Sequence, residues 1–280
     1  MLLHRLAKWA TQPPTPAPIG LELRPDRFAL VHLEQDPTGQ PRILGYARQP
    51  LAPDRLAAAD ALNAAWSGLA LTDRRAVISL PCPPSCFAVL ADEDADWPPP
   101  AQDDRVRASV ALPGERPRIL AGAVPSALLD DALTLLGLAE LEAAQVQIDA
   151  LALLTAYSHL PAWSDELALS RMVVHAGDDD YSWYTLAPAD GLPDEIGLAE
   201  DGAQLIDQLA ARRPSRVFLA GPTKSTQALM ANLQAVLPQA RFCTNPFAGL
   251  PLANEEDRRP LTASAPALSV ALGLALGACR

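Results

Sequence analysis

Alternation between apolar and polar residues predicts a β-hairpin near the middle of the chain. Residues 172–175 form a short β-branched run, residues 177–180 form a polar turn, and residues 181–186 return with aromatic and β-branched side chains. Apolar residues at helical spacing then predict a helix over 202–211. A buried strand follows over 215–221, where a Gly-Pro pair ends it.

The same order of elements occurs near the start of the chain. The pattern predicts strands at 19–23, 28–34 and 43–47, then a helix at 53–69 and a strand at 74–81. We therefore expect two diverged copies of one hairpin, helix, strand unit. This duplication rests on the order of elements and not on residue identity.

The remaining segments complete the two copies. Residues 149–160 predict a helix that is apolar nearly all round, with Asp149 as its N-cap, so it should lie between layers and connect the halves. Gly137 should end a preceding helix, and Thr223 should cap a later one. The pattern further predicts strands at 105–112, 118–124, 145–148 and 241–244, helices at 125–136, 223–237 and 265–279, an exposed linker at 82–102, an acidic connection after the central hairpin and a charged loop at 254–259.

Three regions are expected along the chain. Residues 1–18 form an amphipathic leader and a Pro-rich tether, residues 19–163 form a first domain with a short insertion at about 103–148, and residues 164–280 form a second domain. Residues 1–10 place Leu and Trp on one side with Arg and Lys nearby, which suits a peripheral contact with an anionic membrane. A frayed leader fits the same residues.

Composition narrows the classes of function. The net charge of −11, with scattered basic residues, argues against nucleic acid as a partner. The four cysteines, Cys82, Cys86, Cys243 and Cys279, lack zinc-site spacing and suggest free thiols in a reducing, cytoplasmic setting. The longest apolar run, 265–279, is short against the ~20 residues of a membrane-spanning helix and is better explained as a buried helix.

Candidate catalytic and metal sites are weak. The stretch 221–226 lacks the glycines of a phosphate-binding loop. His175 and the acids at 178–180 could bind a metal, but residues this close in a turn favour a solvated surface turn. His32 and His159 are expected to be structural, and neither cysteine of the 82–86 segment has an evident base. The sequence thus predicts no catalytic residue and no metal site.

Several segments together resemble a known family. Two β-rich units, each completed by a crossing helix, describe the duplicated α/β fold of actin-like (ribonuclease H-like) proteins, here with reduced insertion subdomains. Within that fold, IGLEL at 19–23 is similar to the opening I-G-I-D-I of the PilM family of type IV pilus assembly proteins. Residues 44–51 resemble the family segment L-x-G-Y-x-R-x-P-L, and residues 148–154 resemble V-D-x-x-x-L-A-L-L. Near the end of the chain, residues 245–250 resemble N-P-F-x-G-x, and residues 265–276 resemble A-P-x-x-x-V-A-x-G-L-A-L.

The departures from the family pattern fall on its three nucleotide-binding turns. The first turn is D-I-G-S-S in the family and begins with Glu22 here. Arg24 stands in place of the glycine, and Pro25 removes a backbone N–H donor.

The second turn, D-I-G-x-S/T in the family, has His175 in place of the metal-directing Asp, followed by Gly177 and Asp178. Like charges about 4 Å apart repel by about 4 kcal/mol at an effective dielectric of about 20, so this acidic turn should reject a polyphosphate. The third turn, usually Gly-rich, is Gly221-Pro222. The helical lobe over the nucleotide is also missing from the expected second domain.

The resemblance implies a non-catalytic cytoplasmic scaffold, peripheral to the inner membrane, that needs no cofactor. Its partner would be the N-terminal cytoplasmic peptide of a PilN-like single-span protein, held between the first subdomain and its insertion. The residues themselves predict a strand edge and a helix over 118–136, where such a peptide could pair with strand 118–124 and contact Leu120, Val124, Leu128 and Leu129. Two alternatives stay open: a surviving ATPase that binds ATP and Mg²⁺, and the cytoplasmic scaffold of a type II secretion system.

Overall fold

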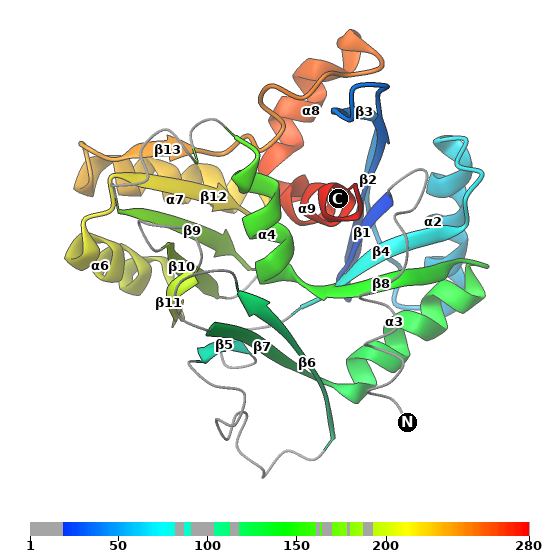
Figure 1. Cartoon of the computed structure of the whole chain (residues 1–280), viewed down its shortest axis with the longest axis horizontal. Helices are drawn as coiled ribbons and strands as arrows, with labels where there is room; N and C mark the ends of the chain where they lie inside the picture. Colours follow the sequence, from blue (N-terminus) through cyan, green and yellow to red (C-terminus); the bar gives the residue numbers. More distant parts are fainter. Residues whose placement is uncertain are drawn as a thin grey trace.

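The computed structural model describes residues 19–81, 87–90, 104–112, 118–160, 163, 170–177, 180–186 and 193–279. Two five-stranded sheets stand side by side with helices between and around them, and a small three-stranded sheet lies below (Figure 1). The leader and tether at 1–18, the cysteines at 82 and 86, and Asp178 lie outside the described residues.

The two large sheets have the same topology. The first has the order β3-β2-β1-β4-β8 and the second has the order β11-β10-β9-β12-β13. In each sheet, the first three strands in chain order form antiparallel pairs with one another. The fourth and fifth strands run parallel to the first strand. The predicted duplication is therefore confirmed. The strands are β1 (Ile19–Leu23), β2 (Arg27–Gln35), β3 (Pro41–Pro50), β4 (Arg75–Leu80) and β8 (Glu142–Ile148), and then β9 (Arg171–Ala176), β10 (Tyr181–Leu186), β11 (Pro193–Ala199), β12 (Arg216–Ala220) and β13 (Arg241–Cys243).

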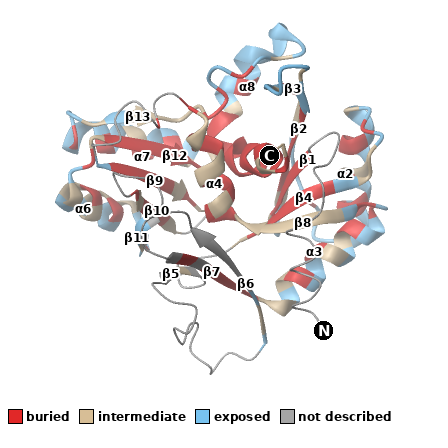
Figure 2. Ribbon diagram, viewed as in Figure 1, coloured by how far each residue is buried: buried red, intermediate tan, exposed pale blue. Residues whose placement is uncertain are grey.

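The helices α4 (Asp149–Ser158) and α9 (Ser269–Ala278) lie between the two sheets. α9 is buried almost throughout, and α4 alternates between buried and half-buried residues (Figure 2). The two helices approach closely at Gly273, where an added Cβ would lie only 1.7 Å from the carbonyl oxygen of Ala152. Tyr157 of α4 also donates a hydrogen bond of 2.7 Å to the carbonyl of Leu219 in β12. As predicted, α4 connects the halves, and one apolar core runs through both.

The outer helices cover the sheets. These are α2 (Arg55–Gly68) and α3 (Ser126–Leu138) in the first half and α6 (Gly202–Arg212) and α7 (Thr223–Val236) in the second. Leu205 and Leu209 give α6 its buried face, and the Asp201 side chain caps it by accepting from the Gln204 N–H. Three local expectations were wrong. Asp149 and Thr223 are not N-caps, because each is the first residue of its helix and makes no capping hydrogen bond. Gly137 does not end α3, which continues to Leu138 and stops before Glu140, whose φ is 55°.

The small sheet consists of β5 (Phe87–Leu90), β6 (Arg105–Leu112) and β7 (Arg118–Pro125), in the order β5-β7-β6. β5 lies inside the segment expected to be an irregular linker, and β11 lies inside the expected acidic connection. β8 pairs with β4 of the first large sheet, so the expected insertion at about 103–148 extends beyond the small sheet into that domain.

The C-terminal helical run is longer than the sequence suggested. A short 3-10 helix (Glu255–Asp257) and α8 (Arg258–Ser264) replace the expected charged loop, and a second 3-10 turn (Ala265–Leu268) leads into α9. The whole run, Glu255–Ala278, has 24 residues and is long and apolar enough to cross a membrane, which corrects the expectation from 265–279 alone. Because 78% of its most apolar window is buried inside the fold, it serves as the core of this structure.

Candidate functional site

The carboxyl ends of the parallel strands meet between the two halves, which is where open α/β sheets place their ligands. In the first half, Glu22 of β1 is in register with Ser79 of β4, and Asp149 directly follows β8. In the second half, His175 of β9 is in register with Ala220 of β12, and Gly221 follows. The structure thus brings together residues from all three turns that the sequence singled out.

A buried ionic cluster occupies the first turn. The Arg24 guanidinium donates to Glu22 Oε1 at 2.8 Å and to Asp149 Oδ2. The side chains of Arg24, Glu22 and Asp149 are only 13%, 9% and 5% exposed. Burial raises the pKa of Asp149 to about 6 although the Arg24 charge acts to lower it. Sequence reasoning missed Asp149 here, because it assigned this side chain to a helix cap.

In each of the three turns, one described backbone donor is already used by the chain itself. The N–H of Arg24 donates to Arg27 O at 2.9 Å, that of Gly177 to Asp180 O at 2.8 Å, and that of Gly221 to Pro266 O at 2.9 Å. Phosphate-binding turns instead direct such N–H groups at the anion. Gly221, with φ of 116°, is needed for packing, since a Cβ would lie 2.2 Å from Ala176 O.

The space left between the halves is small. A cavity of about 10 Å³ lies among Glu22, Arg27, His175, Gly221 and Pro222, with Arg48, Pro266, Ala267 and Val270 completing its lining. That volume suits about one water molecule, whereas ligand pockets measure about 300–1,000 Å³. This cavity is therefore much smaller than a nucleotide.

His175 faces this cavity as a neutral imidazole. Burial, followed by the charges of Arg24 and Arg27, lowers the pKa of His175 to about 3. Among the described residues, no group of three or more His, Cys, Asp and Glu side chains is placed to hold a metal ion.

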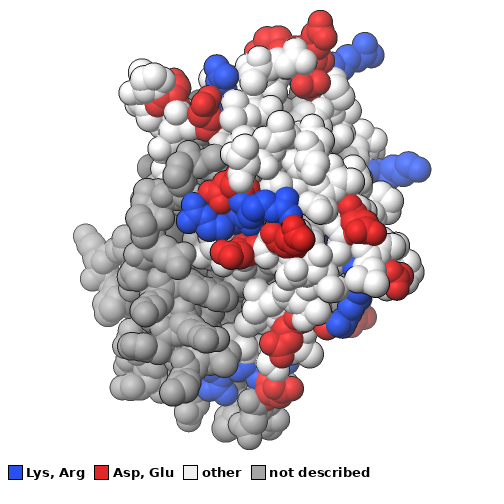
Figure 3. Space-filling model, turned by 90° about the vertical axis from the view of Figure 1, so that its right-hand side faces the viewer, with Lys and Arg blue, Asp and Glu red and all other residues white. Residues whose placement is uncertain are grey.

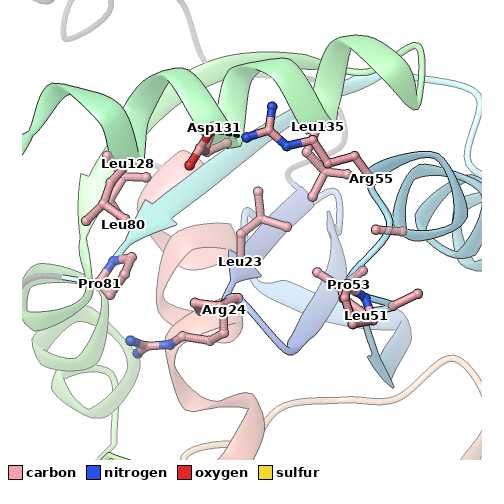
Figure 4. A pocket seen from close by; sticks show the side chains of 14 residues that line it. Leu23, Arg24, Leu51, Pro53, Arg55, Leu80, Pro81, Leu128, Asp131 and Leu135 are labelled. Carbon is pink, nitrogen blue, oxygen red and sulfur yellow. Dashed lines mark hydrogen bonds and ion pairs between the residues drawn. The ribbon is translucent and has the colours of Figure 1, made fainter.

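A larger, apolar groove opens on the other side of the first turn. Its volume is about 230 Å³, and it lies over the ends of β1 and β4 between α2 and α3 (Figure 4). Arg55 of α2 and Asp131 of α3 form an ion pair of 2.5 Å at its rim. The lining residues are Leu23, Arg24, Pro25, Leu51, Ala52, Pro53, Arg55, Ala58, Leu80, Pro81, Leu128, Asp131, Ala132 and Leu135.

Of the four residues predicted to contact a partner, only Leu128 lines this groove. Val124 and Leu129 are 6% and 5% exposed and belong to the core, which corrects their assignment. The side chain of Leu120 lies outside the described parts, although its backbone pairs with both Val89 and Val110.

β7 is therefore the central strand of its sheet. Among the described residues, 119–122 have partners on both sides, so the expected strand pairing along 118–124 is wrong at these residues. The leucines of the strand ends, such as Leu23 and Leu80, were missed. The only sequence signal for Leu80 is the proline that follows it and ends its strand.

On the described part of the face that carries α2, α3 and the edge of β8, the central group of Lys and Arg side chains lies among Asp and Glu side chains (Figure 3). Arg75 pairs with Asp73 at 2.8 Å. Arg74 donates to Ala139 O at 2.8 Å and Glu140 O at 3.0 Å, which satisfies carbonyls at the end of α3. These arginines therefore have structural partners.

Comparisons with known proteins bear on the fold. No protein-family model matches the chain, and a search of curated proteins finds no match. Among solved structures, the chain is similar to one described as a PilM-PilN type IV pilus biogenesis complex, with a TM-score of 0.77 and 16% identity over 96% of this chain and 100% of the other.

Two further structures are similar. A Bacteroides thetaiotaomicron protein with an actin-like ATPase fold and unknown function gives a TM-score of 0.55 and 13% identity, over 88% of this chain and 95% of the other. The ethanolamine utilization protein EutJ from Carboxydothermus hydrogenoformans gives a TM-score of 0.50 and 13% identity, over 98% of this chain and 96% of the other. The predicted fold class is confirmed: this chain has the actin-like fold.

Proposed function

We propose that the chain is a non-catalytic cytoplasmic scaffold of a type IV pilus or related assembly machine, peripheral to the inner membrane. In this proposal it binds the N-terminal cytoplasmic peptide of a PilN-like partner in the groove between α2 and α3 and uses no cofactor. The similarity to the PilM-PilN structure over that chain's full length supports this choice of partner.

The observation that carries the non-catalytic part is the ionic cluster of the first turn. Arg24 is held by Glu22 and Asp149 at the place where an actin-like ATPase would receive phosphate. One described backbone donor in each turn is bonded within the chain, and the cavity beside them has room for about one water. Binding ATP would require breaking these contacts first.

The groove suits an apolar segment of an extended or helical peptide. Leucines from two strand ends and from α3 line it, and the described prolines at its wall, Pro25, Pro53 and Pro81, have no N–H donors to leave unsatisfied. Burying one leucine side chain contributes about 1.5–3 kcal/mol, so one or two apolar anchors could supply much of a micromolar affinity.

The test is a peptide titration with matched variants of α3. A labelled peptide of about 15 residues from the N-terminus of a PilN-like protein is titrated into wild type, Leu128→Asp and Leu138→Asp. Leu138 is 44% exposed and does not line the groove, so it controls for an added charge on the same helix. We expect at least about a tenfold loss of affinity for Leu128→Asp alone. Equal affinities for all three proteins would exclude the groove.

An ATP-binding protein is the second candidate. It is favoured by the acids Glu22 and Asp149, which stand at the strand ends where ligands bind in this class of sheet. A type II secretion scaffold would share the non-catalytic site and differ in its partner.

A further inference from the structure

The turn that joins β1 to β2 belongs to both sites described above. Leu23, Arg24 and Pro25 line the groove. The Arg24 side chain, however, runs away from the groove, and its guanidinium meets Glu22 and Asp149 in the cleft (Figure 4). One residue therefore links the wall of the groove to the first turn of α4.

Backbone hydrogen bonds extend this link to a second wall. Arg24 N donates to Arg27 O at 2.9 Å, and Leu51 N donates to Asp26 O at 2.7 Å. Leu51 also lines the groove, beside Pro53 and Arg55 at the start of α2. A shift of the turn would thus move Leu23, Pro25 and Leu51 together.

We infer that Arg24 is a positioning residue for the groove: its bonds to Glu22 and Asp149 hold the turn against α4 in the shape that accepts the partner peptide, without any bound nucleotide. This inference rests on the proposed function of the groove. It assigns to the cleft a new purpose, which is to support a binding site on its opposite side.

The chemistry of the cluster suits this purpose. A guanidinium is a rigid planar fork that can hold two acceptors in fixed directions, whereas a lysine ammonium fixes neither. Because all three side chains are largely buried, removing one acid leaves a buried charge with less compensation, and the turn must move to relieve it.

The test removes the contact without touching the groove. Asp149 does not line the groove, so Asp149→Asn can change peptide affinity only through the side chains around it, which include Arg24 of the turn and Ser79 of β4. We expect the affinity for the PilN-like peptide to fall about tenfold, which corresponds to about 1.4 kcal/mol. Glu195→Gln is the matched control, because it makes the same acid-to-amide change at the Arg212–Glu195 pair of 2.6 Å in the second half. Its affinity should equal that of wild type.

A second readout separates this inference from the proposed function. Amide hydrogen exchange at Arg24 and Leu51 should quicken about tenfold in Asp149→Asn and stay unchanged in Glu195→Gln, whether or not the peptide binds. If wild type binds no peptide, the proposed function fails. The amide exchange rates still show whether Asp149 and Arg24 hold the turn in place. If Asp149→Asn fails to fold, Glu22→Gln replaces it, because Glu22 bonds Arg24 without lining the groove, and it should show the same two losses. Unchanged affinity together with unchanged exchange in a folded variant would overturn the inference.

Discussion

Adding one methyl group at Gly273 tests the junction on which the duplicated fold depends. In α9, a Cβ at this position would lie 1.7 Å from the carbonyl oxygen and 2.5 Å from the carbonyl carbon of Ala152 in α4. Both obstructing atoms are backbone atoms, so no side chain can rotate away. The two helices would have to separate, and the buried contacts along them would loosen.

The expected magnitude follows from two opposing effects. Overpacking a well-filled core costs about 1–3 kcal/mol, and a backbone clash this short belongs at the upper end. Alanine also has a higher helix propensity than glycine, which stabilises the folded state by about 1 kcal/mol. The Gly273→Ala variant should therefore lose about 2 kcal/mol of unfolding free energy, and its melting temperature should fall by about 4–8 °C.

Gly277→Ala is the matched control in the same helix. Its added Cβ would meet only the Gln147 side-chain amide, at 3.4 Å, and that group can move. We expect this variant to be as stable as wild type or more stable by up to about 1 kcal/mol. Thermal and urea unfolding of the three proteins make the comparison. A Gly273→Ala protein as stable as Gly277→Ala would refute the close packing of α4 on α9.

Two further predictions concern the half-buried His175 and the buried Tyr157. Because the pKa of His175 is lowered to about 3, the unfolded chain gains a proton near pH 6.5 that the folded chain does not. His175 therefore contributes stability that is present above about pH 6.5 and lost as the pH falls below it, by at most about 1.4 kcal/mol per pH unit. Between about pH 7 and about pH 5, wild type should lose more stability than His175→Gln in urea titrations; parallel losses would contradict this assignment. Tyr157→Phe removes the hydrogen bond to Leu219 O and should cost about 1–2 kcal/mol, and an unchanged urea midpoint would argue against that bond.

Periodicity alone predicted the large sheets because their strands bury alternating or continuous apolar residues. β11 escaped prediction because its sequence, PDEIGLA, carries two acids and a glycine. It forms a strand through a tertiary contact: a Cβ on Gly197 would lie 2.0 Å from the Trp183 ring, so glycine lets that ring cover the neighbouring strand. β-propensity reflects such packing more than the backbone itself, and one sequence does not reveal the neighbour.

The sequence predicted the turns of the site but not the contacts between them. The three turns could be located because their glycines, prolines and charges stand at the ends of predicted strands. The contact between Arg24 and Asp149 joins residues 125 positions apart, so a local capping rule could not find it. In α3, sequence alone did not separate Leu128, which faces the groove, from Leu129, which faces the core.

The most direct test of the account is isothermal titration of the purified chain with Mg-ATP and, in a parallel cell, with the N-terminal peptide of the PilN-like protein. The account predicts saturable heat from the peptide and none from Mg-ATP, because the proposed function assigns Arg24 and the turns' own hydrogen bonds to the place where an actin-like ATPase would bind phosphate. Saturable binding of Mg-ATP would mean that the cleft opens, and the non-catalytic scaffold would have to give way to an ATP-binding protein.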